Sequence, residues 1–179
     1  AKARPEAVSF GSTGNGTIGH LAMTQLQARS STRMTHIPYR SGGLAVNDTM
    51  AGTVDMMIGS AALVATQIAA GTFRAVAQFG PARLPALREL PTAEESGYPG
   101  LQAEAWWGVF APHGTPGEVV ARMNTALRET LSEDRIRTQM TETQQARLVM
   151  SDPAGLQRFL DGEVAKWSAV VKEFNIRPD

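Results

Sequence analysis

The sequence predicts an α/β fold in which helices flank a mainly parallel sheet. The main observation is that a short apolar segment followed by a segment with helical spacing occurs three times between residues 8 and 70. The connections between these segments are short and rich in Gly, Ser and Thr. Strand–helix units repeated with short connections are typical of a parallel sheet with right-handed crossovers.

The first unit begins with an apolar strand at residues 8–10, which stops at Gly11. Small and turn-forming residues fill positions 12–16, and apolar residues at helical spacing then predict a helix over residues 17–28. A strand that breaks into such a loop before a helix directs several free N–H groups toward one point. That point suits an anion such as a carboxylate or a phosphate.

Two further units follow. Residues 33–39 predict a short strand, and a turn follows it before a predicted helix over residues 44–50. The mostly apolar residues 54–58 predict a buried parallel strand. A third helix is expected over residues 61–70, and another strand over residues 74–79.

The pattern changes after Gly80. Residues 81–99 contain four prolines, and Thr92 with Glu95 forms a capping-box pattern that predicts a helix ending at Gly97. Residues 103–111, which include two tryptophans and a phenylalanine, predict the last strong strand. The region 8–111 is therefore expected to hold five strands.

The remainder, residues 112–179, is predicted to be almost entirely helical. A second capping-box pattern, Thr115 with Glu118, begins a helix whose apolar face is expected to be buried. That face comprises Val119, Met123, Ala126, Leu127 and Leu131. A helix near residues 134–143 and a weak strand at 147–149 precede a long amphipathic helix that Asp152 and Pro153 open. These apolar stripes have no sheet of their own to cover, which suggests part of a second lobe whose strands lie outside this chain.

Composition excludes several classes of function. The 179 residues carry 17 basic and 17 acidic side chains, which argues against a dedicated nucleic-acid surface. Cysteine is absent and the three histidines are scattered, so we expect no metal site. No apolar run reaches about 18 residues, the length needed to span a membrane. Residues 1–6 are polar and lead straight into a strand, so we expect no signal peptide within this chain.

Two nucleotide-binding patterns partly match the Gly-rich loop. The spacing of Gly11 and Gly16 fits a P-loop, but Thr17 stands where the phosphate-binding lysine belongs. Gly14-x-Gly16-x-x-Gly19 matches a dinucleotide fingerprint by letter. The acidic residue expected about 20 positions later is missing from residues 34–41, although Arg33 or Arg40 would suit a 2′-phosphate. An NADP-binding enzyme domain is therefore the alternative to a binding protein.

A third interpretation is a carboxylate cradle, in which the hydroxyls of Ser12, Thr13 and Thr17 add to the loop N–H groups. A plain tight turn is the simplest alternative. The sequence shows no His–Asp relay for Ser12, so a hydrolase is not favoured. His20 is interpreted as a packed histidine on a helix face.

Six motifs, in order and spanning essentially the whole chain, resemble the Bug family of periplasmic solute-binding proteins, the receptors of tripartite tricarboxylate transporters. The motifs are GSTGNGT with the following His20-Leu21 at residues 11–21, HIPYRSGG at 36–43, AAGTFRA at 69–75, LPTAEESG at 90–97, WWGVFAP at 106–112 and EVAKW at 163–167.

The resemblance implies a type II periplasmic-binding-protein-like fold of two α/β lobes that close over a small organic acid. It implies that residues 7–105 form the second, ligand-binding lobe. Residues 106–179 would then supply a crossover strand and the helical C-terminal part of an incomplete first lobe. Proteins of this family have no catalytic residues, so we expect neither an enzyme nor a cofactor.

The ligand contacts implied by the resemblance lie in the Gly-rich loop and in loops at the same edge of the sheet. They are Ser12, Thr13, Gly14, Asn15, Gly16, Thr17, Tyr39, Gly59, Ser60 and Ala61. Many relatives have an aspartate where this chain has Gly59, so the acid that binds is left open.

The resemblance also implies partners and a location. We expect a small carboxylate ligand, delivery to the membrane permease of a tripartite tricarboxylate transporter, and a periplasmic setting. Because the first lobe is incomplete here, the apolar stripes at residues 119–131 and 156–174 are expected to be exposed. Exposed stripes of this kind favour association, so we expect a homo-oligomer.

Overall fold

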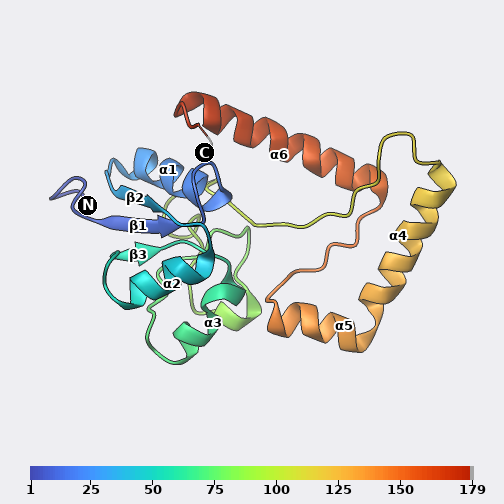
Figure 1. Cartoon of the computed structure of the whole chain (residues 1–179), viewed down its shortest axis with the longest axis horizontal. Helices are drawn as coiled ribbons and strands as arrows, with labels where there is room; N and C mark the ends of the chain where they lie inside the picture. Colours follow the sequence, from blue (N-terminus) through green and yellow to red (C-terminus); the bar gives the residue numbers. More distant parts are fainter. Residues whose placement is uncertain (178–179) are drawn as a thin grey trace. The chain divides into compact units, whose positions relative to one another are not determined.

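The computed structural model describes residues 1–177, and the elements are drawn in Figure 1. In chain order they are β1 (Ser9–Ser12), α1 (Ile18–Ser30), β2 (Thr35–Pro38), α2 (Gly42–Met50), β3 (Met56–Met57), α3 (Ala61–Ala69), the 3-10 helix η1 (Pro85–Leu87), α4 (Gly117–Ser132), α5 (Asp134–Thr138), the π-helix η2 (Gln139–Thr143) and α6 (Pro153–Glu173). The chain divides into two compact units. The first comprises Ala1–Ala105 and the chain from Ser168 onward, and the second comprises Trp106–Trp167.

The first unit contains a parallel sheet with the strand order β2-β1-β3. The central strand pairs with both neighbours at Phe10, which lies opposite His36 in β2 and Met56 in β3. Phe10, Gly11 and Ser12 are buried, as expected for the middle strand of a sheet covered on both faces. The predicted α/β class with a parallel sheet is confirmed.

Helices α1 and α2 cover opposite faces of this sheet (Figure 1). On the α1 face, a Cβ added to Gly19 would lie 3.0 Å from Ile58 and 3.8 Å from the Cβ of Ser12. On the α2 face, a Cβ added to Gly11 would lie 3.1 Å from the Tyr39 ring and 3.5 Å from the Cβ of Ala45. The buried apolar side chains of the described chain all belong to the first unit: Phe10, Leu21, Ala22, Met23, Ala45, Val46, Val54, Ala93, Leu101 and Val170.

Three of the predicted strands do not form in the described chain. Residues 74–79 contribute only an isolated parallel bridge between Gln78 and Thr92, and residues 103–111 and 147–149 have no strand. The reason is that a strand needs a neighbouring backbone to pair with. The amide of Ala103 donates to the carbonyl of Phe79 at 2.8 Å. The apolar residues that follow, up to residue 111, form no strand. The third predicted strand shrinks from residues 54–58 to Met56–Met57.

The two capping-box patterns have different outcomes. At the first, the Thr92 amide donates to Glu95 Oε2 at 2.8 Å and the Glu95 amide donates to Thr92 Oγ1 at 3.1 Å. Only a turn follows, because Gly97 adopts a φ of 95° two residues later and ends it. At the second, the hydroxyl of Thr115 donates to the Pro112 carbonyl at 2.8 Å, and α4 begins beyond Pro116.

In the second unit, the apolar face of α4 is exposed, as predicted for the stripe at residues 119–131, and the expectation from the helix pattern alone that this face is buried is wrong. Val119 is 40% exposed, Met123 46% and Leu127 37%. The structure describes all of residues 106–167, and none of them is buried. The unit is built from helices without a sheet of its own, so these apolar side chains have nothing to cover.

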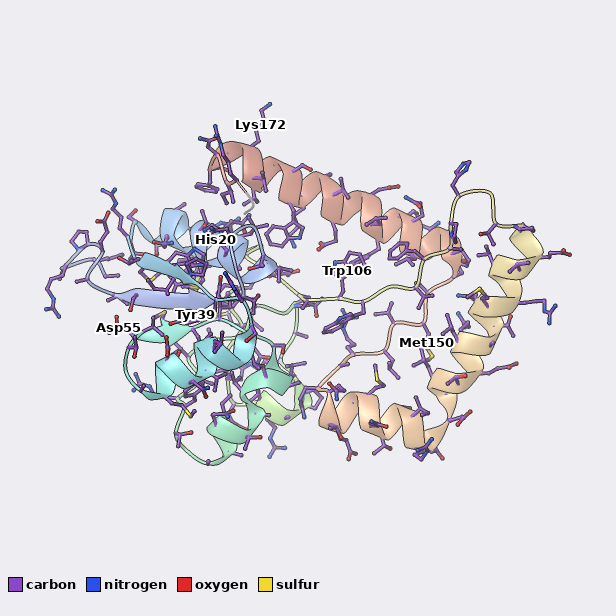
Figure 2. All side chains as sticks on the ribbon, viewed as in Figure 1. His20, Tyr39, Asp55, Trp106, Met150 and Lys172 are labelled. Carbon is purple, nitrogen blue, oxygen red and sulfur yellow. The ribbon has the colours of Figure 1, made fainter. Side chains whose placement is uncertain are left out.

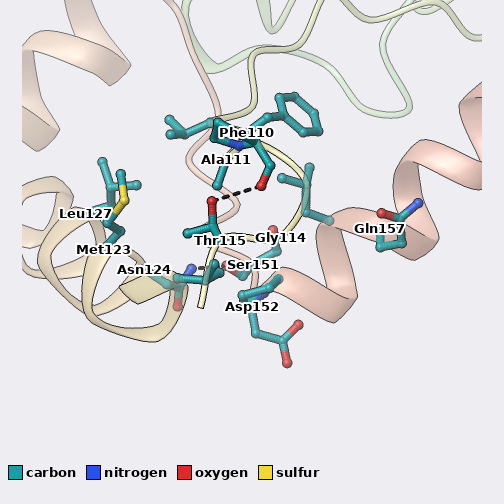
Figure 3. A pocket seen from close by; sticks show the side chains of 15 residues that line it. Phe110, Ala111, Gly114, Thr115, Met123, Asn124, Leu127, Ser151, Asp152 and Gln157 are labelled. Carbon is teal, nitrogen blue, oxygen red and sulfur yellow. Dashed lines mark hydrogen bonds between the residues drawn. The ribbon is translucent and has the colours of Figure 1, made fainter. Parts of the chain in front are cut away.

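Local contacts still order parts of this unit. Trp106 packs edge-on against Phe159, with ring centroids 5.2 Å apart, and Asn124 donates its amide to the Ser151 carbonyl at 3.0 Å. Between α4 and the start of α6 lies an open, mainly apolar hollow of about 260 Å³, lined in part by Met123 and Leu127 (Figure 3). Among the helices that the structure describes, none is both long enough and apolar enough to cross a membrane.

Candidate functional site

The carboxyl edge of the sheet brings together the loops that the sequence singles out. Because the three strands are parallel, the loops at residues 13–17, 39–41 and 58–60 all leave the sheet at this edge. A Cβ added to Gly14 would lie 3.9 Å from the carbonyl oxygen of Tyr39, so the first two loops touch. Open α/β sheets bind ligands at this edge, where strand order changes direction.

The Gly-rich loop depends on backbone conformations that glycine adopts most readily. Gly14 has a φ of 123° and Gly16 a φ of 70°. The next residue, Thr17, is extended and serves as the N-cap position of α1, but its hydroxyl donates to the Gly14 carbonyl at 2.8 Å. The first N–H groups of a helix have no intrahelical acceptor. The first N–H groups of α1 lie directly after this loop.

Ser12 is part of the internal structure of the loop. Its side chain is fully buried, and its Oγ lies 2.7 Å from His36 Nε2. The same oxygen lies 3.2 Å from the carbonyl oxygen and 3.3 Å from the amide nitrogen of Gly14. Thr13, by contrast, is exposed. Ser12 and Thr17 therefore use their hydroxyls within the loop, whereas the exposed Thr13 carries a hydroxyl at its surface.

Two histidines, His20 and His36, contact the loop, and neither was among the ligand-binding residues expected from the sequence. The Gly16 amide donates to His20 Nδ1 at 3.1 Å, and the rings of His20 and His36 stack with centroids 4.1 Å apart. His36 also stacks on the buried Phe10, at 4.8 Å. The one signal in the sequence is that His20 lies four residues after Gly16, on the first turn of the helix. Nothing in the sequence connects His36 to Ser12, 24 residues earlier.

Tyr39 lies at the end of β2, and its hydroxyl is directed to α2 (Figure 2). The hydroxyl donates to Asp48 Oδ2 at 2.8 Å, and the Tyr39 amide donates to the Ser12 carbonyl at 2.9 Å. Partial burial raises the pKa of Tyr39 above its usual value, and the neighbouring Asp48 carboxylate raises it further. The Tyr39 hydroxyl can donate to a ligand only if its hydrogen bond to Asp48 is broken.

Gly59, Ser60 and Ala61 form the third part of the edge. The Ile58 amide donates to the Gly11 carbonyl at 3.0 Å, and Ser60 is the extended N-cap residue of α3. A Cβ on Gly59 would lie 3.0 Å from a methyl of Leu63 and 3.2 Å from the Met57 methyl. An aspartate here would therefore require Leu63 to move, which gives a local reason for glycine at this position.

The structure supplies no site for a metal ion among its described residues, which contain no cluster of three or more metal-ligating side chains. The chemistry available at this edge is hydrogen-bond donation by loop and helix N-terminal N–H groups. Such donors bind an anion and orient it, and they need no titratable partner to do so.

Comparison with protein families gives a match to the tripartite tricarboxylate transporter family receptor over residues 1–176. A relative from Pseudomonas sp. (strain P51), described as a UPF0065 protein in the tcbD-tcbE intergenic region, is 35% identical over 177 residues. The match covers 98% of this chain and 52% of that protein. The chain thus spans about half the length of this relative.

Solved structures give the same relationship. The structure of Rpa4515 from R. palustris with adipate matches with a TM-score of 0.87 and 30% identity, covering 100% of this chain and 60% of that one. The structure of MatC from Rhodopseudomonas palustris with bound malate matches with a TM-score of 0.72 and 25% identity, covering 93% of this chain and 57% of that one. With a family match over nearly the whole chain, this protein belongs to the tripartite tricarboxylate transporter receptor family.

Proposed function

We propose that this chain is the ligand-binding part of an extracytoplasmic solute-binding protein that captures a small organic acid. The observation that carries the proposal is the Gly-rich loop of residues 12–17. It lies at the carboxyl edge of a parallel sheet, directly before α1, in a chain that belongs to a family of solute receptors. A site made of N–H donors binds and releases an acid without changing it, which fits a receptor.

The ligand class proposed is a dicarboxylic acid or a close relative of one. Both structural neighbours named above hold such acids, adipate in one and malate in the other. Because the hydroxyls of Ser12 and Thr17 are used inside the loop, we propose that one carboxylate contacts mainly backbone N–H groups of residues 13–18. The Gly14 and Gly16 amides are excluded from this set, because they donate to Ser12 and His20. The N–H groups of Ser60 and Ala61, at the start of α3, are the second proposed set of donors.

We further propose that residues 7–105 form the ligand-binding lobe and that residues 106–179 belong to an incomplete first lobe. Two observations support this assignment. The second compact unit buries none of its residues, and the chain spans about half the length of its Pseudomonas relative. A segment with no core of its own needs further polypeptide to cover it.

The proposed partner is the membrane permease of a tripartite tricarboxylate transporter, to which the loaded receptor delivers its acid. Receptors of this family include periplasmic binding proteins, and we propose the same setting for this chain. We also propose that the chain forms a homo-oligomer through the exposed apolar face of α4, since large exposed apolar patches favour association. The stripe expected to be exposed at residues 156–174 contributes less, because within it only Phe159 and Val164 are exposed large apolar residues and Val170 is buried.

Ligand binding is tested by a thermal-shift screen with malate, adipate, citrate, aromatic acids and NADP. A ligand at about 100 times its dissociation constant adds roughly 2.7 kcal/mol of stability. The matched variant is Ala61→Pro. It removes one proposed N–H donor at the first position of a helix, where proline is tolerated, after a residue with the extended conformation (φ −67°, ψ 151°) that proline requires.

We expect a dicarboxylate to raise the melting temperature of the wild-type chain. Ala61→Pro should weaken that response without lowering the melting temperature of the unliganded protein. Gly117→Pro is the control, because it makes the same change at the first position of α4, after an extended Pro116. A response to NADP and to no acid, or silence across all the acids, would contradict the proposal for this chain.

A further inference from the structure

We propose that His20 and His36 are positioning residues that hold the Gly-rich loop in its ligand-binding conformation. The proposal rests on the proposed function, because it treats residues 12–17 as the loop that receives the acid. It goes further by identifying what keeps this loop in place. The two histidines come from different elements, His20 from α1 and His36 from β2, and their rings meet beside the loop.

His20 holds the C-terminal part of the loop. The Gly16 amide donates to His20 Nδ1 at 3.1 Å, so this nitrogen accepts and carries no proton. In the neutral ring the proton is therefore on Nε2. The bond fixes the direction of the Gly16 peptide immediately before the first N–H groups of α1.

His36 holds the N-terminal part. Its Nε2 lies 2.7 Å from Ser12 Oγ, and this oxygen lies within 3.3 Å of both backbone polar atoms of Gly14. A hydroxyl has one proton, so two arrangements are consistent. In one, His36 donates to Ser12 and Ser12 donates to the Gly14 carbonyl. In the other, Ser12 donates to His36 and accepts from the Gly14 amide. Both arrangements tie Gly14 to the sheet through Ser12.

Stacking joins the two supports into one unit. The rings of His20 and His36 are nearly parallel, with an interplanar angle of 11°. His36 in turn stacks on Phe10, which is fully buried in the central strand. The pair is thereby anchored to a buried residue of the central strand, and Figure 2 shows His20 at the start of α1.

The loop needs such support because of its composition. Gly14 and Gly16 have positive φ and glycine has wide conformational freedom, so the loop by itself would sample many conformations. Ordering those conformations at the moment of binding weakens affinity. Side chains that order the loop beforehand reduce that cost.

The test uses two pairs of variants that separate hydrogen bonding from ring packing. His20→Asn keeps an acceptor at the δ position for Gly16, whereas His20→Phe keeps a ring for stacking and loses the acceptor. His36→Gln keeps a polar atom at the ε position for Ser12, and His36→Phe again keeps only the ring. His113→Phe, an exposed histidine in the second unit, is the control.

Two measurements are made on every variant. One is the dissociation constant for an acid that stabilises the wild-type chain. The other is the hydrogen-exchange rate of the Gly14 and Gly16 amides without ligand. We expect each Phe variant to bind the acid about five- to ten-fold more weakly, since about one hydrogen bond is lost. Amide exchange in the loop should rise, while the Asn and Gln variants recover most of both properties.

Several outcomes would overturn the inference. Phe variants that bind and exchange like the wild type would show that the hydrogen bonds of the two histidines do not order the loop. Asn and Gln variants as impaired as the Phe variants would show that a hydrogen-bonding atom without the ring does not hold the loop. If the wild-type chain binds no acid, the proposed function fails. The amide-exchange rates then decide the inference by themselves, because they need no ligand.

Discussion

At the scale of single residues, the candidate site depends on glycines that the backbone requires. Gly16 has a φ of 70°, a conformation that costs other L-residues roughly 1–2 kcal/mol. The Gly16 amide also donates to His20, so the position has both a conformational and a hydrogen-bonding role. The motif was recognisable in the sequence, but only the structure shows which of its glycines adopt a positive φ.

Replacing Gly16 with alanine should therefore destabilise the first unit by about 1–2 kcal/mol, because Ala disfavours positive φ. Chemical denaturation measures the change. Gly162→Ala in α6 is the matched control, since an added Cβ there meets nothing within 4 Å. Alanine is the better helix former, so this variant should be neutral or stabilised by up to about 1 kcal/mol. Equal losses in both variants would contradict the role of φ.

A second single-residue effect concerns Asp55, whose carboxylate joins the start of β1 to the segment before β3. Asp55 Oδ2 accepts from both the amide and the hydroxyl of Ser9, each at 2.8 Å. The backbone bond from Ser9, followed by the hydroxyl bond, lowers the pKa of Asp55 below its usual value. A lowered pKa in the folded state means that the stabilisation is present above the unfolded-state pKa of about 3.9. It is lost as the pH falls through the folded-state value.

Asp55→Asn should accordingly lower the melting temperature at neutral pH. The difference from wild type should shrink as the pH falls below about 4, because the Asp55 carboxyl becomes protonated first in the unfolded chain and, at lower pH, in the folded chain. Melting curves between about pH 2.5 and pH 7 provide the measurement. Glu129→Gln, which removes an exposed carboxylate from α4, is the control. A difference that stays constant across this range would show that the Ser9 contacts do not depend on charge.

At the scale of elements, the proline-rich segment after residue 80 is organised by one side chain. The buried Gln78 donates its Nε2 to the carbonyls of Leu87 and Leu90, at 3.0 and 2.7 Å, and its Oε1 accepts from the Leu84 amide at 2.9 Å. Its backbone bonds to Pro91 and Ala93. The predicted strand at residues 74–79 is thus replaced by a loop that is folded around an amide.

Gln78→Leu keeps the approximate volume but leaves three backbone groups without this partner. We expect a loss of about 2–4 kcal/mol, because unpaired buried polar groups are costly. Urea unfolding measures the loss, and Gln144→Leu, at an exposed position, is the control. A variant as stable as the wild type would show that water replaces the glutamine amide without cost.

At the scale of the whole molecule, the two compact units differ in how they bury apolar surface. Every buried apolar side chain named above belongs to the first unit. The second unit exposes Trp107 at 82% and Val149 at 65% as well as the α4 face. Hydrophobic burial is the main stabilising term in folding, so the second unit depends on further contacts.

We therefore predict that the chain associates with itself at micromolar concentration. Light scattering after size-exclusion chromatography measures the mass. Placing charges on the α4 face with the double variant Met123→Glu and Leu127→Glu should reduce it to that of a monomer, because charged side chains are expensive to bury. Thr125→Glu, on a different side of the same helix, should leave association intact. A monomeric wild-type chain would contradict the prediction.

The sequence by itself determined the features that depend on local patterns. The three parallel strands, the helix that follows the Gly-rich loop and the long amphipathic helix near the C-terminus all follow from residue periodicity and turn chemistry. The motifs in order also identified the family, which the match over residues 1–176 confirms.

The tertiary structure decided what depends on residues far apart in the chain. The strands expected at residues 74–79 and 103–111 did not form, because strand formation requires a pairing partner as well as apolar residues. The same holds for the site. Ser12, His20 and His36 meet only because parallel pairing places β2 beside β1 and α1 folds back over both. No local pattern encodes that meeting, since it arises from the register of two strands and the packing of a helix.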